Sequence, residues 1–152
     1  MIYSVALALL LGFELSYYLL IIQTGIAEHY NSELITLSPM FVGGVLGTVL
    51  AGKPWGKLVN PIHKIYVALS LQLVLSLLYP NYNIVTLALL GIAVGMMAPL
   101  GIYLFKGKQQ AKFLLALAIA YTTGTYLFTT EADSRMWMAV LFTSIALVAA
   151  LL

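Results

Sequence analysis

The sequence predicts an all-α integral membrane protein, a bundle of six transmembrane helices in a single domain over residues 1–152. Two observations lead to this class. First, 62% of the 152 residues are hydrophobic and only 8% are charged, whereas about 25% of the residues of a soluble domain are charged. Second, apolar segments recur with a length of about 20 residues, which is the length that crosses about 30 Å of hydrocarbon.

Six apolar segments are predicted to be membrane spans, separated by short polar or turn-forming breaks. They are residues 2–23, 34–52, 62–79, 84–105, 111–128 and 136–152. The breaks include "KPWGKLVNP" and "PNYN", and clusters of Gly, Pro and Asn mark turns. The first segment is expected to be a retained helix, because no Lys or Arg precedes it and no A-x-A cleavage site follows it. Because the breaks are short, neighbouring helices are expected to be antiparallel.

The basic residues predict the orientation. Six of the seven flank the second and fourth breaks: Lys53, Lys57, Lys64, Lys106, Lys108 and Lys112. The seventh, Arg135, flanks an odd-numbered break. Cytoplasmic loops carry an excess of Lys and Arg, so both termini are expected to be cytoplasmic. The first three helices would then run opposite to the last three, which allows a 3+3 inverted repeat with a site near the midplane.

Stripes of small residues predict where helices pack. Such residues recur every four positions in three segments: Gly43, Gly47 and Ala51; Gly91 and Gly95; Ala116, Ala120 and Gly124. Small residues at this spacing let helix backbones approach closely in lipid. Packing inside the bundle is the favoured interpretation, and a substrate path or a dimer face remains open.

One acidic residue, Glu14 in "GFELSYYLL", lies near the middle of the first segment. An acid at the bilayer centre costs roughly 2.5–3.5 kcal/mol on insertion scales, so Glu14 is expected to face the bundle interior. Tyr17 and Tyr18 follow three and four residues later and are expected to share its helix face, where their hydroxyls can donate hydrogen bonds to it. Gln72 lies at a comparable depth in the third segment.

These four residues, Glu14, Tyr17, Tyr18 and Gln72, form the candidate intramembrane polar site. The spans contain no Lys or Arg at this depth that can pair with Glu14. Three roles stay open: a neutral carboxyl that links helices, a site for a cation or a proton, and a contact with a partner subunit.

Other chemistry has little support. A net charge of +2 does not provide the clustered basic face that nucleic acid requires, and the absence of cysteine excludes thiolate metal sites. His29 and His63 are expected at opposite membrane faces, so they cannot share one metal or haem. Because no P-loop, G-x-S-x-G or H-E-x-x-H motif occurs, we expect no enzymatic activity, catalytic residue, metal or cofactor. For "AEHYNSE", a helix-capping loop is favoured over an outer ligand site.

Four stretches carry a family resemblance in their order and spacing: "GFELSYYLLIIQTGIAEHYNSE", "FVGGVLGTVLAGK", "GIAVGMMAPLGIYL" and "AIAYTTGTYLF". Together they resemble the membrane domain of fused spermidine synthases, which is itself similar to half of a major facilitator transporter. The resemblance implies a six-helix domain in the cytoplasmic membrane of a prokaryote. Family members continue into a soluble synthase domain, for whose catalytic acids this sequence has no matching positions.

Two function classes follow from these observations. The first is a half-transporter or binding module in the lipid bilayer that acts as a homo-oligomer, with Glu14 recognising a small cation, and specifically an amine if the resemblance holds. The second is a noncatalytic accessory subunit that associates with other membrane subunits of a larger complex.

Overall fold

The computed structural model describes residues 2–31, 33–53, 60–104 and 134–151, and the single positions Leu115, Ala118, Ile119 and Thr122. Every regular element in these residues is helical, which confirms the predicted all-α class. The fifth predicted segment, 111–128, lies almost wholly outside the described residues, and Gly124 lies outside them with it.

The described helices follow the remaining predicted segments. They are α1 (Ile2–Tyr17), η1 (Tyr18–Ile26), α2 (Ala27–His29), α3 (Leu34–Gly52), α4 (Pro61–Ser76), α5 (Ile84–Leu104) and α7 (Arg135–Leu151). The first three elements form one continuous rod, in which η1 is a π-helical stretch of nine residues. Within it, Thr24 Oγ1 donates a hydrogen bond of 2.8 Å to the carbonyl of Leu19, five residues earlier.

Local side chains fix where α4 and α5 begin. The Asn60 side chain accepts a hydrogen bond of 3.0 Å from the backbone N–H of Ile62, and Pro61 occupies the first turn, where its fixed φ suits a helix start. Before α5, the Asn83 side chain accepts from the Thr86 N–H at 2.9 Å, and the Thr86 hydroxyl accepts from the Asn83 N–H at 2.8 Å. This reciprocal pair is a capping box.

The far end of α3 is capped from another helix. The Nζ atom of Lys64, in the first turn of α4, donates hydrogen bonds of 2.7 Å to the carbonyls of both Ala51 and Lys53. Lys64 is buried, and a cation at a helix C-terminus offsets the negative end of the helix dipole. This lysine therefore ties the start of α4 to the end of α3.

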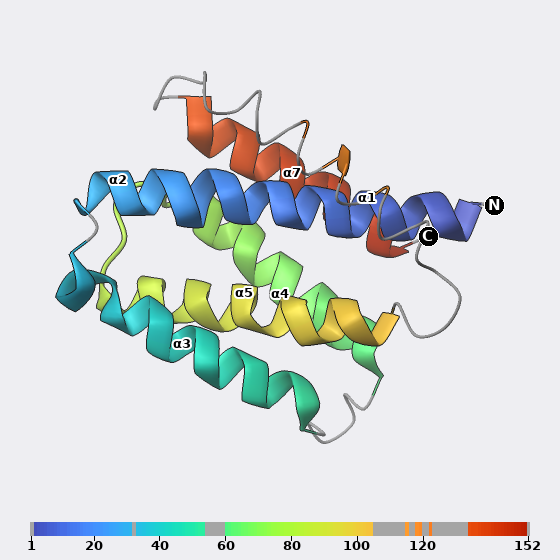
Figure 1. The fold of residues 1–152 in the computed structure, drawn as a ribbon, viewed down its shortest axis with the longest axis horizontal. Helices are drawn as coiled ribbons and strands as arrows, with labels where there is room; N and C mark the ends of the chain where they lie inside the picture. The colour runs from blue at the N-terminus through green and yellow to red at the C-terminus, as the bar shows by residue number, and fades with distance from the viewer. Residues whose placement is uncertain are drawn as a thin grey trace.

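The helices pack as two pairs joined by a fifth helix (Figure 1). Helix α3 packs on α5, α1 packs on α7, and α4 contacts both α5 and α7. Both chain ends lie at the same end of the bundle (Figure 1). One buried cluster includes Leu10, Ile65 and Met96, and a second includes Tyr17, Ile21 and Leu90. The core therefore runs along the whole bundle.

Two helical stretches are long and apolar enough to cross a membrane, Val5–His29 with 25 residues and Ile84–Leu104 with 21. The prediction of six spans is thus not supported by the described part of the chain. The reason is length: α4 has 16 residues and α7 has 17, which at 1.5 Å per residue is short of about 30 Å. A buried core helix of a soluble protein, or a signal sequence near the N-terminus, satisfies the same criterion.

Candidate functional site

The carboxyl group of Glu14 is buried between α1 and α4, with 7% of the residue exposed. Gln72, which is fully buried on α4, donates from Nε2 to both carboxyl oxygens, at 3.1 Å to Oε1 and 3.3 Å to Oε2. Neutral amide hydrogen bonds stabilise a buried carboxyl but leave its charge unbalanced. Glu14 is therefore held in place without a counter-ion among the described residues.

Polar contacts continue from Gln72 toward Tyr17. The Ser76 hydroxyl donates a hydrogen bond of 2.7 Å to the Gln72 carbonyl and lies 3.2 Å from the hydroxyl oxygen of Tyr17. All three side chains are fully buried. The Oε1 atom of Gln72 is buried and has no partner among the described residues. These contacts fix the rotation of α4 relative to α1, and so fix which way Gln72 faces Glu14.

Glu14 also lines a groove of about 800 Å³ between α1, η1, α3 and α5. Among the described lining residues only Glu14, Tyr18 and Thr48 carry polar side chains, and the others are apolar residues or glycine. The Thr48 hydroxyl donates to the carbonyls of Gly44 and Gly95, at 3.0 and 3.1 Å, so its donor capacity is already used. Glu14 is thus the only ionisable carboxyl among the described residues that line the groove.

The structure brings together some of the predicted polar residues and separates others. Glu14 and Gln72 are in contact, and Tyr18 lines the same groove. No described hydrogen bond joins Glu14 to Tyr17 or Tyr18, the two tyrosines whose hydroxyls were considered able to donate to it. Tyr17 instead points into the α1–α4 contact, where Ser76 meets its hydroxyl. Tyr18 begins the π-helical stretch and lies on the same face as Glu14, since both line the groove.

The predicted packing glycines lie where α3 meets α5. A Cβ atom added at Gly43 or Gly47 would overlap the carbonyl oxygen of Ala88 or Ile92, respectively. The relation is reciprocal, since added Cβ atoms on α5, at Gly91 and Gly95, would overlap the carbonyl oxygens of Met40 and Gly44 on α3. Each helix therefore lays its backbone directly on the glycines of the other.

The third member of the α3 stripe, Ala51, has a different environment. It is buried in the cluster that contains Ile65 and Ala68 of α4, and its carbonyl accepts the hydrogen bond from Lys64. At Ala51 the stripe thus meets α4 in addition to α5, whose Met96 and Leu100 belong to the same cluster.

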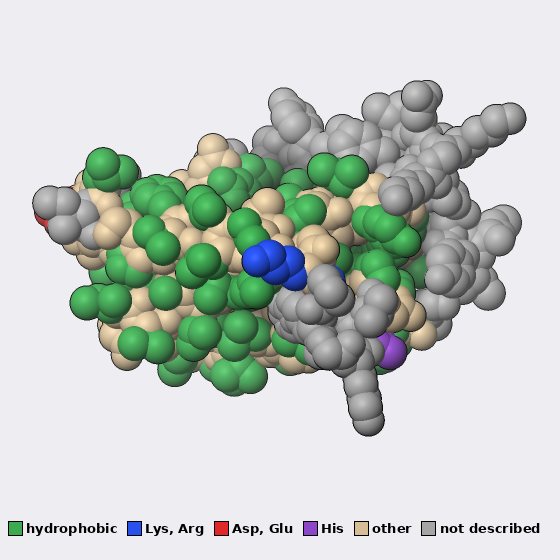
Figure 2. Space-filling model, turned by 90° about the horizontal axis from the view of Figure 1, so that it is seen from below, with side chains coloured by type: hydrophobic (Ala, Val, Ile, Leu, Met, Phe, Trp, Pro, Cys, Tyr) green, Lys and Arg blue, Asp and Glu red, His purple; other side chains and the backbone are tan. Residues whose placement is uncertain are grey.

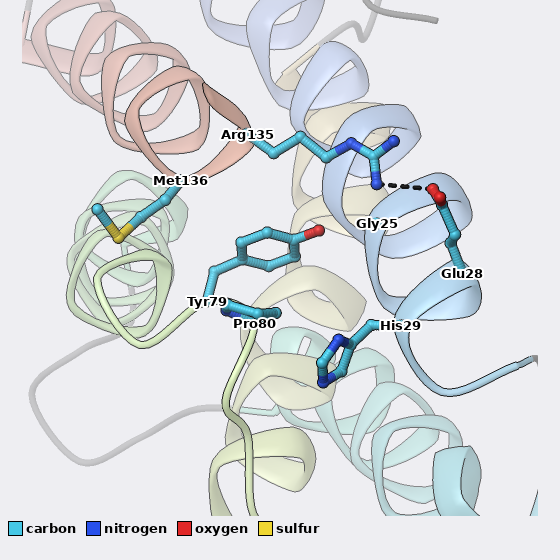
Figure 3. Close-up of a pocket in the computed structure, with 7 residues that line it drawn as sticks. All are labelled: Gly25, Glu28, His29, Tyr79, Pro80, Arg135 and Met136. Carbon is cyan, nitrogen blue, oxygen red and sulfur yellow. Dashed lines mark hydrogen bonds and ion pairs between the residues drawn. The ribbon is translucent and has the colours of Figure 1, made fainter. Parts of the chain in front are cut away.

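A second pocket, of about 410 Å³, lies beside α2, which is at the opposite end of the bundle from the chain termini (Figure 1). Figure 3 shows the residues that line this pocket. Its described lining residues come from the end of the first rod, from the turn after α4 and from the start of α7: Gly25, Glu28, His29, Tyr79, Pro80, Arg135 and Met136. Arg135 Nη1 donates to Glu28 Oε2 at 2.7 Å. Nothing in the sequence grouped these residues, because they come from three separate parts of the chain, residues 25–29, 79–80 and 135–136. The sequence feature that could have indicated this pocket was Arg135, the one basic residue among the acids that are predicted to lie on the outer side.

Comparisons with known proteins do not add a family to this geometry. No family model, no curated protein and no solved structure matches the chain. In addition, no group of three His, Asp or Glu residues in the described part of the chain is arranged to hold a metal ion. The chemistry of the two pockets is therefore inferred from their own residues.

Proposed function

We propose that this chain is a membrane-embedded module that binds a small organic cation in the groove between α1, α3 and α5, with Glu14 as the counter-ion. The observation that carries this proposal is the placement of Glu14: a buried carboxyl that opens on an apolar groove and has only an amide as its described polar partner. The resemblance to the membrane domain of fused spermidine synthases, drawn from sequence motifs, supports an amine as the ligand.

The outer surface of α3 supports a membrane location. Its exposed side chains outside the groove include Val42, Leu46 and Val49, with Val42 59% exposed. Apolar side chains also cover much of the face shown in Figure 2. Soluble monomers rarely expose contiguous apolar patches larger than a few hundred Å². In a membrane these side chains lie against lipid hydrocarbon, so no apolar surface is exposed to water there.

The pattern of helix contacts supports the proposed inverted repeat. Exchanging α1 with α5 and α4 with α7 turns the α1–α7 contact into the α5–α4 contact, and both contacts are present. The exchanged helices also run in opposite directions (Figure 1). Inverted repeats place binding sites near the midplane at the repeat interface, and the α1–α5 groove that Glu14 lines lies between two exchanged helices.

The lining of the groove favours a cation with an apolar body. An unbalanced carboxylate in a medium of low dielectric constant attracts a positive charge more strongly than it does in water. Phe41 and Tyr18 offer aromatic rings to the same groove, and such rings attract ammonium groups. Because the described lining holds one carboxyl, a monoamine suits it better than a polyamine, whose further charges would lie among apolar side chains.

The test uses the purified protein in lipid nanodiscs and two ligands of nearly equal shape, 2-phenylethylamine and the neutral 2-phenylethanol. We expect the wild type to bind the amine by calorimetry and Glu14→Gln to bind it at least tenfold more weakly, which corresponds to about 1.4 kcal/mol. Glu33→Gln makes the same chemical change at an exposed position and should leave binding intact. Equal binding of amine and alcohol, or full binding by Glu14→Gln, would refute the proposal.

The alternative of an accessory subunit draws on the same exposed α3 face, since a partner helix covers apolar side chains as well as lipid does. Purification from the native membrane in mild detergent distinguishes the binding module from the accessory subunit. A homo-oligomer that binds the amine supports the binding module. A stable complex with other subunits and no amine affinity supports the accessory role.

A further inference from the structure

The pocket at the outer end of the bundle holds a positive and a negative side chain next to each other. Arg135 extends across it from the first turn of α7 toward Glu28 (Figure 3). Only 9% of Arg135 is exposed, whereas the side chain of Glu28 is 64% exposed. The Nε atom of Arg135 is buried and has no hydrogen-bond partner among the described residues. Because a ligand in the pocket cannot reach this buried atom, Arg135 acts on a ligand through the charge of its guanidinium group, whose Nη1 atom already binds Glu28.

The two charges restrict which ligands fit. A simple anion that approaches Arg135 is repelled by Glu28, and a simple cation that approaches Glu28 is repelled by Arg135. A ligand that carries both charges a few ångströms apart meets each with its opposite. Carboxylates form especially strong hydrogen bonds with the planar guanidinium group, which presents several N–H donors in one plane.

The remaining walls suit a small apolar group. Tyr79, Pro80 and Met136 line one side of the pocket (Figure 3). The Tyr79 ring lies against the rod at Gly25, where an added Cβ would be only 2.6 Å from the Tyr79 hydroxyl oxygen. Glycine at this position therefore leaves room for the hydroxyl end of the Tyr79 ring. The volume of about 410 Å³ falls near the lower end of the range of about 300–1,000 Å³ that small-molecule sites occupy.

We propose that this pocket binds a free apolar amino acid as its zwitterion. The carboxylate pairs with the guanidinium group of Arg135, the ammonium group pairs with Glu28, and the side chain rests on Tyr79, Pro80 and Met136. This site is separate from the groove at Glu14, and it does not depend on the function proposed there.

The test measures binding of L-leucine and of its two halves to the purified protein in phosphatidylcholine nanodiscs. The halves are 4-methylpentanoate, which lacks the ammonium group, and 3-methylbutylamine, which lacks the carboxylate. We expect leucine to bind at least tenfold more tightly than either half. Similar affinities for leucine and one of its halves would overturn the proposal, because a single charge would then be sufficient.

Two variants locate the binding. Arg135→Lys keeps the positive charge but removes the planar guanidinium group, and Glu28→Gln removes the negative charge at an exposed side chain, so neither is expected to prevent folding. Each should weaken leucine binding at least tenfold, whereas Glu33→Gln, five residues from Glu28, should not change it. Unchanged leucine binding in both pocket variants would overturn the assignment. So would a phosphatidylethanolamine molecule that copurifies with the wild type and is lost from Arg135→Lys, since the pocket would then hold a lipid headgroup.

Discussion

Glu14 and Gln72 form the polar contact at the centre of the bundle, and each depends on the other. The Gln72 amide donates to both carboxyl oxygens, and Gln72 is fully buried. Removing one member leaves the other without a partner, and the loss is set by the desolvation of the remaining group. The stability losses of the two single substitutions should therefore not sum to the loss of the double substitution.

The first prediction concerns this coupling. We expect Gln72→Leu alone to lower the free energy of unfolding by about 1–3 kcal/mol, because the Glu14 carboxyl keeps its burial and loses its described partner. The double substitution Glu14→Leu with Gln72→Leu should recover part of that loss. Denaturation of Gln72→Leu, Glu14→Leu, the double variant and the wild type in one detergent measures the coupling. Strictly additive losses would show that the two side chains act independently.

The second prediction concerns Lys64. Replacing it with Met keeps most of the apolar stem but removes the two hydrogen bonds to the end of α3. Hydrogen bonds from charged donors contribute about 1.5–3 kcal/mol, so the thermal midpoint should fall. Lys53→Met is the matched control, since Lys53 is exposed and contributes only its backbone carbonyl to this cap. An equal fall in both variants would place the effect in net charge instead of the cap.

At the scale of elements, sequence reasoning located the helices better than it located their contacts. Segments 34–52 and 84–105 match α3 and α5 to within one residue, because polar and turn-forming residues interrupt the apolar sequence at their ends. The first helix was predicted to end at residue 23, whereas the structure continues it to His29. Nothing in the sequence indicates the π-helical stretch that extends it. The spacing of glycines identified residues suited to close packing, but which helix meets which depends on the whole bundle.

The third prediction tests the α3–α5 contact. Gly47→Ala places a methyl group on the carbonyl oxygen of Ile92, so the helices must separate, and overpacking costs about 1–3 kcal/mol. Gly52→Ala is the control, because a Cβ atom there has no neighbour within 4 Å. It should leave stability unchanged or raise it slightly, since alanine favours the helix over glycine. Equal thermal midpoints for the two variants would contradict the structure at this contact.

At the scale of the whole molecule, the polar site was only partly predictable. Glu14 and Gln72 could be paired because both are polar groups at similar depth in apolar segments. The pocket of Glu28, Tyr79 and Arg135 could not, because residues from three separate parts of the chain meet there. Such a site follows from the arrangement of helices, and the spacing of residues in the sequence does not contain it.

The fourth prediction concerns orientation. Since the chain has no cysteine, a single Cys introduced at Glu33 or at Lys53 is a clean reporter, and both positions are exposed. A membrane-impermeant maleimide should label position 33 in intact cells and position 53 only after the cells are opened, as the distribution of lysines requires. The reverse pattern would invert the proposed topology, and labelling of both positions in intact cells would argue against a membrane-embedded bundle.

The glycine contact between α3 and α5 has a consequence for synthesis. Helix α3 ends at Gly52, and α5 begins at Ile84, with α4 between them. At a translation rate of roughly 5–20 residues per second, the ribosome takes about 2–6 s to make the intervening stretch. Throughout that interval the glycines of α3 have no α5 backbone to rest on. A nascent chain that stops before Ile84 therefore carries an unpacked helix, and such truncated products should be recognised and degraded faster than the complete chain.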